Sequence, residues 1–164
     1  GDCIGHNCEF YAVEAAAPEP FMKCYCEICR KTVGGGGYSI NVGADYRTLK
    51  VKGREHVRTY RVRLDRTEYG KDEPNAARKK SKVDRRFCGC YGSALWVYSP
   101  LYPELVHPFA GAIDTPLPKA PEANHILLDY APEWIEVPCG PRQHHLKRYP
   151  SESLAAWHKR RGLD

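Results

Sequence analysis

The sequence predicts a mostly β domain that carries one short helix near its C-terminus. Short segments rich in β-branched and aromatic residues recur along the chain, and several of them alternate apolar with polar side chains. Proline and glycine interrupt regular structure between these segments. Only the C-terminal segment has a clear helical pattern. Together these observations favour the β class.

Four expected strands lie in the first part of the chain. Residues 9–13 form a short segment that ends before a proline-containing stretch. Residues 38–42 and 49–53 alternate apolar and polar side chains, and residues 57–64 combine this period with β-branched and aromatic residues. A period of two is typical of strands that expose one face to solvent.

Three further strands and one helix are expected in the second half. Residues 94–99 and 125–128 are nearly continuous apolar runs, which are typical of deeply buried strands. Residues 134–137 read WIEV and follow a proline turn, so we expect another strand there. The helix is expected at residues 151–162, where basic residues lie near the C-terminal end. A single helical turn is also expected after Cys29.

Length and charge favour one domain with a basic surface loop. A chain of 164 residues fits one core, so we expect residues 1–164 to form a single domain. Residues 61–86 contain ten basic and five acidic residues, and this excess accounts for the whole net charge of +5. Residues 66–82 lack apolar periodicity, so we expect a surface loop. Acidic residues share this stretch, so a solvent-exposed charged loop explains the basic excess better than nucleic-acid binding does.

Composition limits the class of protein. Hydrophobic residues make up 42% of the chain and charged residues 27%, as in ordinary globular proteins. No segment has the roughly 20 apolar residues that cross a bilayer, and the first residues lack the pattern of a secretory signal. We therefore expect a soluble cytoplasmic protein with no membrane partner, and the missing initiator methionine is compatible with a trimmed start.

Eight cysteines in such a chain favour metal or thiol chemistry over disulfides. Cys24, Cys26 and Cys29 lie within six residues, in the sequence CYCEIC. C-x-x-C is the usual spacing of a zinc knuckle, and the additional C-x-C lets a third thiolate reach the same ion. A redox dithiol is a weaker alternative because the chain lacks the α/β setting that such dithiols usually have. Small buried residues without a ligand are the other alternative.

The remaining cysteines favour a second metal site less strongly. Cys3 and Cys8 form a pair near the N-terminus, and Cys88 and Cys90 form a pair in the middle of the chain. If the two pairs converge, they make a closed four-thiolate structural zinc site. Free thiols or a crosslink are the alternatives. Cys139 is expected to be a lone thiol.

The chain carries a further set of motifs, which are CYCEICRKTVGG at 24–35, FCGCYGS at 87–93, GAID at 111–114, Cys3 with Phe10, and the spaced residues Pro121, His125, Ile126 and Trp134. In this order the motifs resemble the glutathione-dependent formaldehyde-activating family, which also includes centromere protein V. The resemblance covers nearly the whole chain, and it implies a compact fold of several coiled antiparallel β-sheets with one structural zinc and one three-cysteine zinc. It also implies that Cys24, Cys26 and Cys29 bind the open, catalytic zinc.

The chain departs from this family pattern at the structural zinc. Gly5 stands where the second cysteine of the front pair is expected, and Tyr91 stands where the second cysteine of the rear pair is expected. Either Cys8 and Cys90 replace these ligands, or packing around Tyr91 replaces the ion. A histidine that is frequent between the first two catalytic cysteines is Tyr25 here. One zinc ion is therefore expected, and a second is an open alternative.

Three thiolates around one divalent ion favour chemistry on sulfur. Such a centre carries a net charge of about −1, so it activates water poorly and is better suited to holding a substrate thiolate or orienting a carbonyl. This fits the family reaction, in which glutathione and formaldehyde combine to S-hydroxymethylglutathione. We expect a zinc-dependent carbon–sulfur lyase. The alternatives are a zinc Lewis-acid enzyme for another small molecule, for example in specialised metabolism, and a non-catalytic zinc scaffold.

Two further residues are candidates for proton transfer. Asp114 and His125 carry suitable side chains, although Asp114 also fits a turn before Pro116 and a lone histidine at a strand start is often structural. The expected partner is a small molecule, either glutathione or another thiol. The glycine run at 34–37 is expected to be a flexible connector rather than the lip of a pocket.

Overall fold

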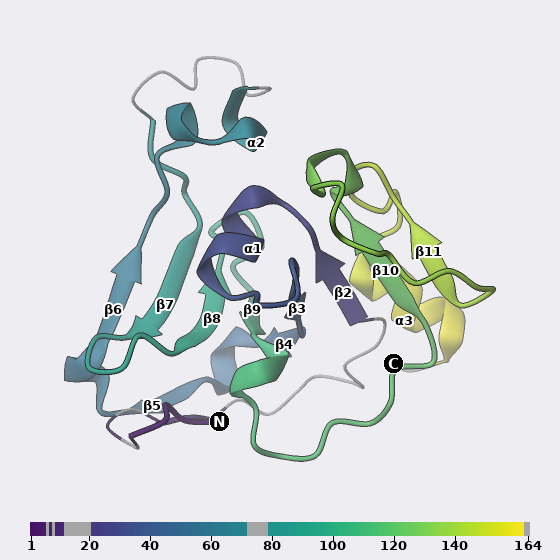
Figure 1. The fold of residues 1–164 in the computed structure, drawn as a ribbon. Coiled ribbons are helices and arrows are strands. Elements are labelled where there is room, and N and C mark those ends of the chain that lie inside the picture. Colours follow the sequence, from purple (N-terminus) through teal and green to yellow (C-terminus); the bar gives the residue numbers. More distant parts are fainter. Residues whose placement is uncertain (6, 8, 12–20, 72–78, 163–164) are drawn as a thin grey trace.

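The computed structural model describes residues 1–5, 7, 9–11, 21–71 and 79–162 (Figure 1). These residues form eleven short strands and three α-helices. The strands are β1 (Glu9–Tyr11), β2 (Phe21–Cys24), β3 (Ser39–Asn41), β4 (Ala44–Asp45), β5 (Lys50–Lys52), β6 (Val57–Tyr60), β7 (Asp84–Cys88), β8 (Ala94–Tyr98), β9 (Leu105–Pro108), β10 (Ala123–Ile126) and β11 (Gln143–His145). The helices are α1 (Glu27–Thr32), α2 (Glu68–Lys71) and α3 (Leu154–Arg161).

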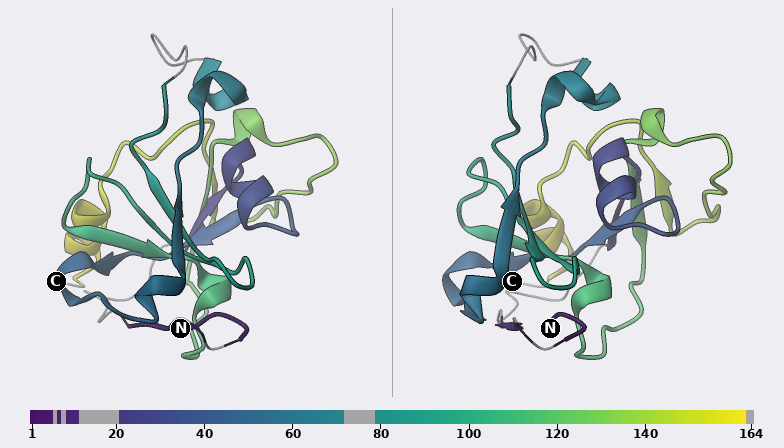
Figure 2. Two further views of the ribbon diagram at one scale, coloured as in Figure 1. Left: turned by 90° about the vertical axis from the view of Figure 1, so that its left-hand side faces the viewer. Right: turned by 60° about the vertical axis from the view of Figure 1, so that its left-hand side comes forward.

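The strands form three sheets, which confirms the mostly β prediction. The largest sheet has the strand order β4-β9-β8-β7-β6, and all of its pairs are antiparallel. A second sheet has the order β11-β10-β2-β3, in which β10 runs parallel to both of its neighbours. Strands β1 and β5 form a two-stranded sheet at one end of the molecule, and α2 lies at the opposite end (Figure 1, Figure 2).

The first apolar cluster joins the two-stranded sheet to the large sheet. Phe10 from β1 packs against Trp96 from β8, with ring centroids 5.4 Å apart. Burial of each large apolar side chain contributes roughly 1.5–3 kcal/mol, so this cluster fixes β1 against the sheet. Its buried members are Cys3, Phe10, Ala44, Cys88, Leu95, Trp96 and Val106.

The second apolar cluster contains the cysteines of the CYCEIC segment. Figure 1 shows α1 between the large sheet and the strands β10 and β11. Ile28 of α1, Val62 after β6 and Ile126 of β10 meet in this cluster, so it joins the two larger sheets through α1. Its buried members are Cys24, Cys26, Ile28, Cys29, Val62, Ile126, Leu127 and Tyr130.

Most of the expected strands are present but shorter than predicted. Strands β1, β3, β5, β6, β8 and β10 lie within or overlap the predicted segments, while residues 12 and 13 of the first segment lie outside the described residues. In the segment 57–64 the strand ends at Tyr60, and the chain turns at Leu64–Arg66. The C-terminal helix is confirmed as α3, and the turn expected after Cys29 is part of α1.

The strand expected at residues 134–137 is wrong. The backbone N–H of Ile135 donates to the carbonyl of Pro132 at 3.1 Å, which makes a turn, and Trp134 is 68% exposed. A β-carbon on Gly37 would lie 2.4 Å from Cδ1 of Ile135, so the isoleucine packs directly on the glycine backbone. Gly37 also has a φ of 84°, which favours glycine. The apolar residues of this segment therefore serve packing on the glycine run, not strand pairing.

Part of the basic loop lies within the described residues. Residues 68–71 form α2, the bridge between Arg63 and Lys80 closes the base of the loop, and residues 72–78 lie outside the described residues. None of the helices in the described segments is long and apolar enough to cross a membrane.

The C-terminal helix is held by a buried carboxylate. Glu122 lies just before β10 and accepts hydrogen bonds from Nε1 of Trp157 at 2.7 Å, from Arg161 at 2.7 Å and from His144 at 3.1 Å. Burial by itself raises the pKa of Glu122, but these hydrogen bonds and the charge of Arg161 lower it overall. The carboxylate thus ties α3 and β11 to the edge of β10.

We expect Glu122→Gln to lower the free energy of unfolding at pH 7 by roughly 1.5–3 kcal/mol, since hydrogen bonds to charged groups contribute about that much. Because the folded-state pKa is lowered, the contribution is complete above the usual glutamate value of about 4.3 and is lost as the pH falls through the folded-state value. Urea denaturation at several pH values measures both effects. Glu152→Gln, which breaks an exposed pair with Arg160, is the control and should cost about 1 kcal/mol or less. If Glu122→Gln and Glu152→Gln were equally stable at pH 7, the Glu122 carboxylate would not be what holds α3 in place.

Candidate metal centre

The three clustered cysteines lie on one turn between β2 and α1. Cys24 is the last residue of β2, Cys26 caps the N-terminus of α1, and Cys29 lies in its first turn. The backbone N–H of Cys29 donates to Sγ of Cys26 at 3.4 Å, and the N–H of Tyr25 donates to the carbonyl of Ile126 at 3.1 Å. These bonds fold the turn and tie it to β10, so the three side chains point to one place.

The three sulfur atoms form a compact group. The Sγ atoms of Cys24, Cys26 and Cys29 all lie within 4.8 Å of one another, and each residue is 3–4% exposed. Among the described residues, no fourth cysteine, histidine or carboxylate belongs to this group. Three soft donors in one place fit zinc, and a closed structural site would need a fourth. The donor set thus fits a zinc ion that keeps one position for water or a substrate.

Arg85 on β7 touches this sulfur group. Its Nη2 donates to Sγ of Cys29 at 3.5 Å, while its Nη1 is buried and has no hydrogen-bond partner in the described part of the chain. Hydrogen bonds from Cys24 and Cys26, together with the positive charge of Arg85, hold the pKa of the Cys29 thiol well below its ordinary value. Arg85 therefore places a positive charge beside the sulfur group.

A buried chain of polar side chains supports the turn. Tyr25 and His125 are fully buried, and the hydroxyl of Tyr25 lies 2.7 Å from Nδ1 of His125. Nε2 of His125 lies 2.7 Å from Oε1 of Gln143. Because an amide oxygen only accepts, Nε2 carries the proton and Nδ1 accepts from the tyrosine. Burial lowers the pKa of His125, which agrees with a neutral ring.

The two proton-transfer candidates therefore have different surroundings. Both ring nitrogens of His125 are engaged inside the protein, so its geometry fits a residue that positions Tyr25. The side chain of Asp114 is 70% exposed and lies 3.8 Å from the N-terminal amine. Asp114 follows Ala112 and Ile113, which pack against the first apolar cluster. The three clustered cysteines belong to the second apolar cluster. The structure does not bring Asp114 and His125 together, and a role for Asp114 stays a prediction.

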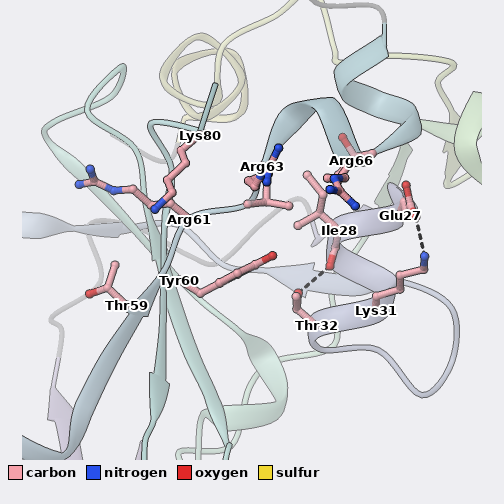
Figure 3. Close-up of a pocket in the computed structure, with 12 residues that line it drawn as sticks. Glu27, Ile28, Lys31, Thr32, Thr59, Tyr60, Arg61, Arg63, Arg66 and Lys80 are labelled. Carbon is pink, nitrogen blue, oxygen red and sulfur yellow. Dashed lines mark hydrogen bonds and ion pairs between the residues drawn. The ribbon is translucent and has the colours of Figure 1, made fainter. Parts of the chain in front are cut away.

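A groove lies between α1 and the segment that runs from the end of β6 to Thr67. Its volume is about 830 Å³, and Figure 3 shows Tyr60 extending from β6 toward Ile28 and Thr32 of α1. Ile28 and Val62 line it and also belong to the cluster that contains the cysteines. Several of its basic side chains already have acidic partners, so its charge is partly neutralised. The pairs are Lys31 with Glu27, Arg61 with Asp84, and Arg63 with Asp65.

The glycine run also lines a hollow. Residues 34–36 form part of the wall of a cavity of about 230 Å³, together with Tyr38 and Phe109. This arrangement corresponds to the lip of a pocket, which was the alternative to a flexible connector.

Three of the four cysteines expected to hold a second zinc lie within the described residues. Cys3 and Cys88 are fully buried in the first apolar cluster. Cys90 is exposed and its sulfur lies 3.5 Å from Nδ1 of His56. Cys8 lies outside the described residues. At the two family positions, a β-carbon on Gly5 would lie 2.0 Å from the ring of Tyr91. Among the described residues, Cys3, Cys88 and Cys90 form no common sulfur group, so a second zinc site at these cysteines stays a prediction.

Cys139, the expected lone thiol, and two histidines of β11 lie at the surface. Cys139 is exposed. His144 contacts Glu122, and Nε2 of His145 lies 2.8 Å from the carbonyl oxygen of Pro138, so both histidines have partners within the protein.

The sequence reasoning missed Arg85 and Gln143. Arg85 was counted only as part of the basic stretch, because no strand was expected at residues 84–88. In a strand, neighbouring residues point to opposite faces, so Arg85 and Arg86 separate: one reaches Cys29 and the other Asp84. The alternation of side chains along a strand could have separated Arg85 from Arg86 in the sequence. No sequence pattern points to Gln143, because only the fold brings it to His125.

Comparison with known proteins agrees with the motifs. Residues 1–129 match the family described as glutathione-dependent formaldehyde-activating enzyme. A Halomonas elongata protein named as a candidate glutathione-dependent formaldehyde-activating enzyme is 45% identical over 154 residues, which cover 94% of this chain and 90% of that protein.

A crystal structure of a Rhodobacter sphaeroides protein has a similar fold. Its TM-score is 0.53 at 18% sequence identity, and the match covers 72% of this chain and 90% of that one. At this identity the likeness concerns the fold alone. The family match over most of the chain and the 45% identical relative both confirm the resemblance drawn from the motifs. The chain therefore belongs to the glutathione-dependent formaldehyde-activating enzyme family.

Proposed function

We propose that this protein is a zinc-dependent carbon–sulfur lyase that makes and breaks the bond between a thiol and formaldehyde or a similar small carbonyl compound. Glutathione is the thiol that the family name and the name of the Halomonas relative suggest. The observation that carries the proposal is the buried group of three cysteine sulfurs within 4.8 Å, to which the described residues add no fourth ligand. That donor set suits chemistry on sulfur better than activation of water.

Each residue of the site has a separate task in this proposal. Cys24, Cys26 and Cys29 hold the zinc ion, which when bound supplies a Lewis-acid position for a substrate sulfur or oxygen. The Tyr25 hydroxyl and His125 keep the turn in place, so the thiolates are preorganised. Arg85 places a positive charge beside three thiolates and offsets part of their negative charge.

The reaction balances without a redox partner. In the direction of cleavage, the hydroxyl proton of S-hydroxymethylglutathione goes to solvent, the oxygen forms the carbonyl bond of formaldehyde, and the carbon–sulfur bond breaks with its electron pair on sulfur. In the direction of synthesis, the thiolate attacks the carbonyl carbon and the oxygen takes up a proton. The protein has to exclude competing water and orient the two reactants, which is consistent with the buried cysteines.

Exchange NMR with ¹³C-formaldehyde and glutathione tests the proposal, because the reaction also proceeds unaided and only an excess rate counts. We expect the zinc-loaded protein to accelerate exchange between formaldehyde and the adduct in proportion to its concentration. Cys139→Ser changes an exposed thiol and should retain the full rate. A zinc-loaded protein that leaves the exchange rate at the uncatalysed value would contradict the proposal and favour a zinc scaffold or an enzyme for another substrate.

A further inference from the structure

Arg85 has an unusual position among the basic residues of this chain. It lies on β7 opposite Tyr60 of β6 and Val97 of β8, and its side chain reaches the cysteine turn across the sheet face. Its neighbour Arg86 binds the carboxylate of Asp84 at 2.7 Å. The described contact of the Arg85 guanidinium is instead with a thiol sulfur, Sγ of Cys29.

The two terminal nitrogens of the Arg85 guanidinium differ in their contacts. Nη2 donates to Cys29, whereas Nη1 is shielded from solvent and lacks a partner within the described residues. A buried donor without an acceptor is costly, and native structures rarely keep one without a reason. Arginine presents its N–H groups as a rigid planar fork that matches two acceptors at once. The free Nη1 is therefore a preorganised donor beside the sulfur group.

We propose that Nη1 of Arg85 binds the oxygen of the substrate's S–CH₂–O⁻ group while Nη2 stays on Cys29. This inference rests on the proposed function, in which the hydroxyl proton leaves to solvent and negative charge develops on that oxygen before the carbon–sulfur bond breaks. The guanidinium stays charged throughout, so it stabilises the oxyanion by hydrogen bonding and charge and does not take the proton. In synthesis, the same N–H stabilises the oxyanion that forms as the thiolate attacks formaldehyde.

Replacement of Arg85 with glutamine should lower kcat for formaldehyde exchange roughly 10²–10³-fold, as loss of one oxyanion donor does in other enzymes. Zinc content, measured by elemental analysis, should stay unchanged. Arg86→Gln is the matched control, because this neighbour binds Asp84 and should leave the rate within about twofold. Arg85→Lys keeps the charge but not the fork, and we expect it to recover part of the rate.

A binding measurement tests the same assignment without turnover. Cobalt-substituted protein is titrated with mercaptoacetate and with ethanethiol, and the sulfur-to-cobalt absorption band reports binding. We expect the wild-type protein to prefer mercaptoacetate by at least about tenfold, because its carboxylate reaches Arg85, and we expect Arg85→Gln to abolish that preference while ethanethiol binds equally well.

The outcomes are distinguishable. If the wild-type protein does not accelerate exchange but Arg85→Gln still loses the mercaptoacetate preference, the proposed reaction is wrong and the anion-binding role of Arg85 stands. If Arg85→Gln loses its metal, or keeps both the rate and the preference, the assignment of Arg85 is overturned.

A second inference rests on a different observation, the contact between Gly5 and Tyr91. A β-carbon on Gly5 would lie 2.0, 2.1 and 2.4 Å from three atoms at the hydroxyl end of the Tyr91 ring. The two segments also meet through the N–H of Ile4, which donates to the hydroxyl of Ser93 at 3.5 Å. Cys3 and Cys88 lie behind them in one apolar cluster. The half-exposed tyrosine ring therefore lies directly on the backbone of residue 5, where only a glycine leaves room for it.

We infer that the Tyr91 ring over Gly5 replaces the structural zinc, so the chain binds one zinc ion and keeps Cys3 and Cys88 as buried thiols. Gly5→Ala should lower the melting temperature because the new methyl group collides with the ring, and adding Tyr91→Ala should restore most of the loss. Gly5→Cys with Tyr91→Cys should raise the zinc content from one to two ions per chain, with Cys3→Ser in that background returning it to one. A wild-type protein that holds two zinc ions, or a double-cysteine variant that stays at one, would overturn the inference.

Discussion

Replacing Cys26 with serine is expected to abolish catalysis while the protein stays folded. Loss of one of three thiolates should weaken zinc binding and activity by more than about 100-fold, since even outer contacts of a metal site cost about 10–100-fold. The helix should survive, because Sγ of Cys26 caps α1 by accepting from Cys29 and serine is a favoured residue at that position. Elemental analysis measures the zinc content, circular dichroism measures the helix and the fold, and formaldehyde exchange measures the activity.

The controls for this variant are the two exposed thiols. Cys90→Ser and Cys139→Ser remove cysteines that lie outside the sulfur group and should keep metal, fold and rate. A Cys26→Ser protein that unfolds together with metal loss would instead indicate a structural zinc. Retention of the full rate would contradict the assignment of Cys26 as a ligand.

The second large effect is expected at His125. Its ring bridges Tyr25 and Gln143, so His125→Ala removes two hydrogen bonds and leaves the buried Tyr25 hydroxyl and the half-buried Gln143 amide without this partner. Each unsatisfied group costs about 1–3 kcal/mol and the cavity adds to this, so we expect a loss of roughly 3–5 kcal/mol in the free energy of unfolding. Urea denaturation monitored by tryptophan fluorescence measures it.

A neighbouring histidine supplies the comparison. His145 is exposed, so His145→Ala should cost about 1 kcal/mol or less. Tyr25→Phe keeps the ring and removes only the hydroxyl, and it should cost about 1–3 kcal/mol by leaving Nδ1 of His125 unpaired. If His125→Ala is no less stable than His145→Ala, the buried chain of hydrogen bonds does not support the turn.

Local patterns were sufficient to predict that the three clustered cysteines share one turn. The spacing of Cys24, Cys26 and Cys29 is a local property, because a strand that ends at the first cysteine and a helix capped by the second bring the three side chains together. The same holds for β8, whose continuous apolar run is buried, and for α3 with its basic C-terminal end. Each of these elements is determined by neighbours in the sequence.

Elements that depend on distant partners could not be predicted. The segment at 134–137 has strand-forming residues, but Ile135 packs on Gly37, about a hundred residues away in the chain. Strand β2 has no alternating pattern and is a strand because β10 and β3 pair with it on either side. The contact of Arg85 with Cys29 and that of Gln143 with His125 also join segments that are far apart in sequence. Tertiary contacts decided all of these cases.

The central claim is a zinc ion held by Cys24, Cys26 and Cys29 with one position left for the substrate. Zinc K-edge X-ray absorption on the protein as purified, without added metal or chelator, tests it most directly. We expect one zinc ion per chain, three sulfur neighbours at about 2.3 Å and one nitrogen or oxygen neighbour. Four sulfur neighbours, or a protein without zinc, would contradict the account.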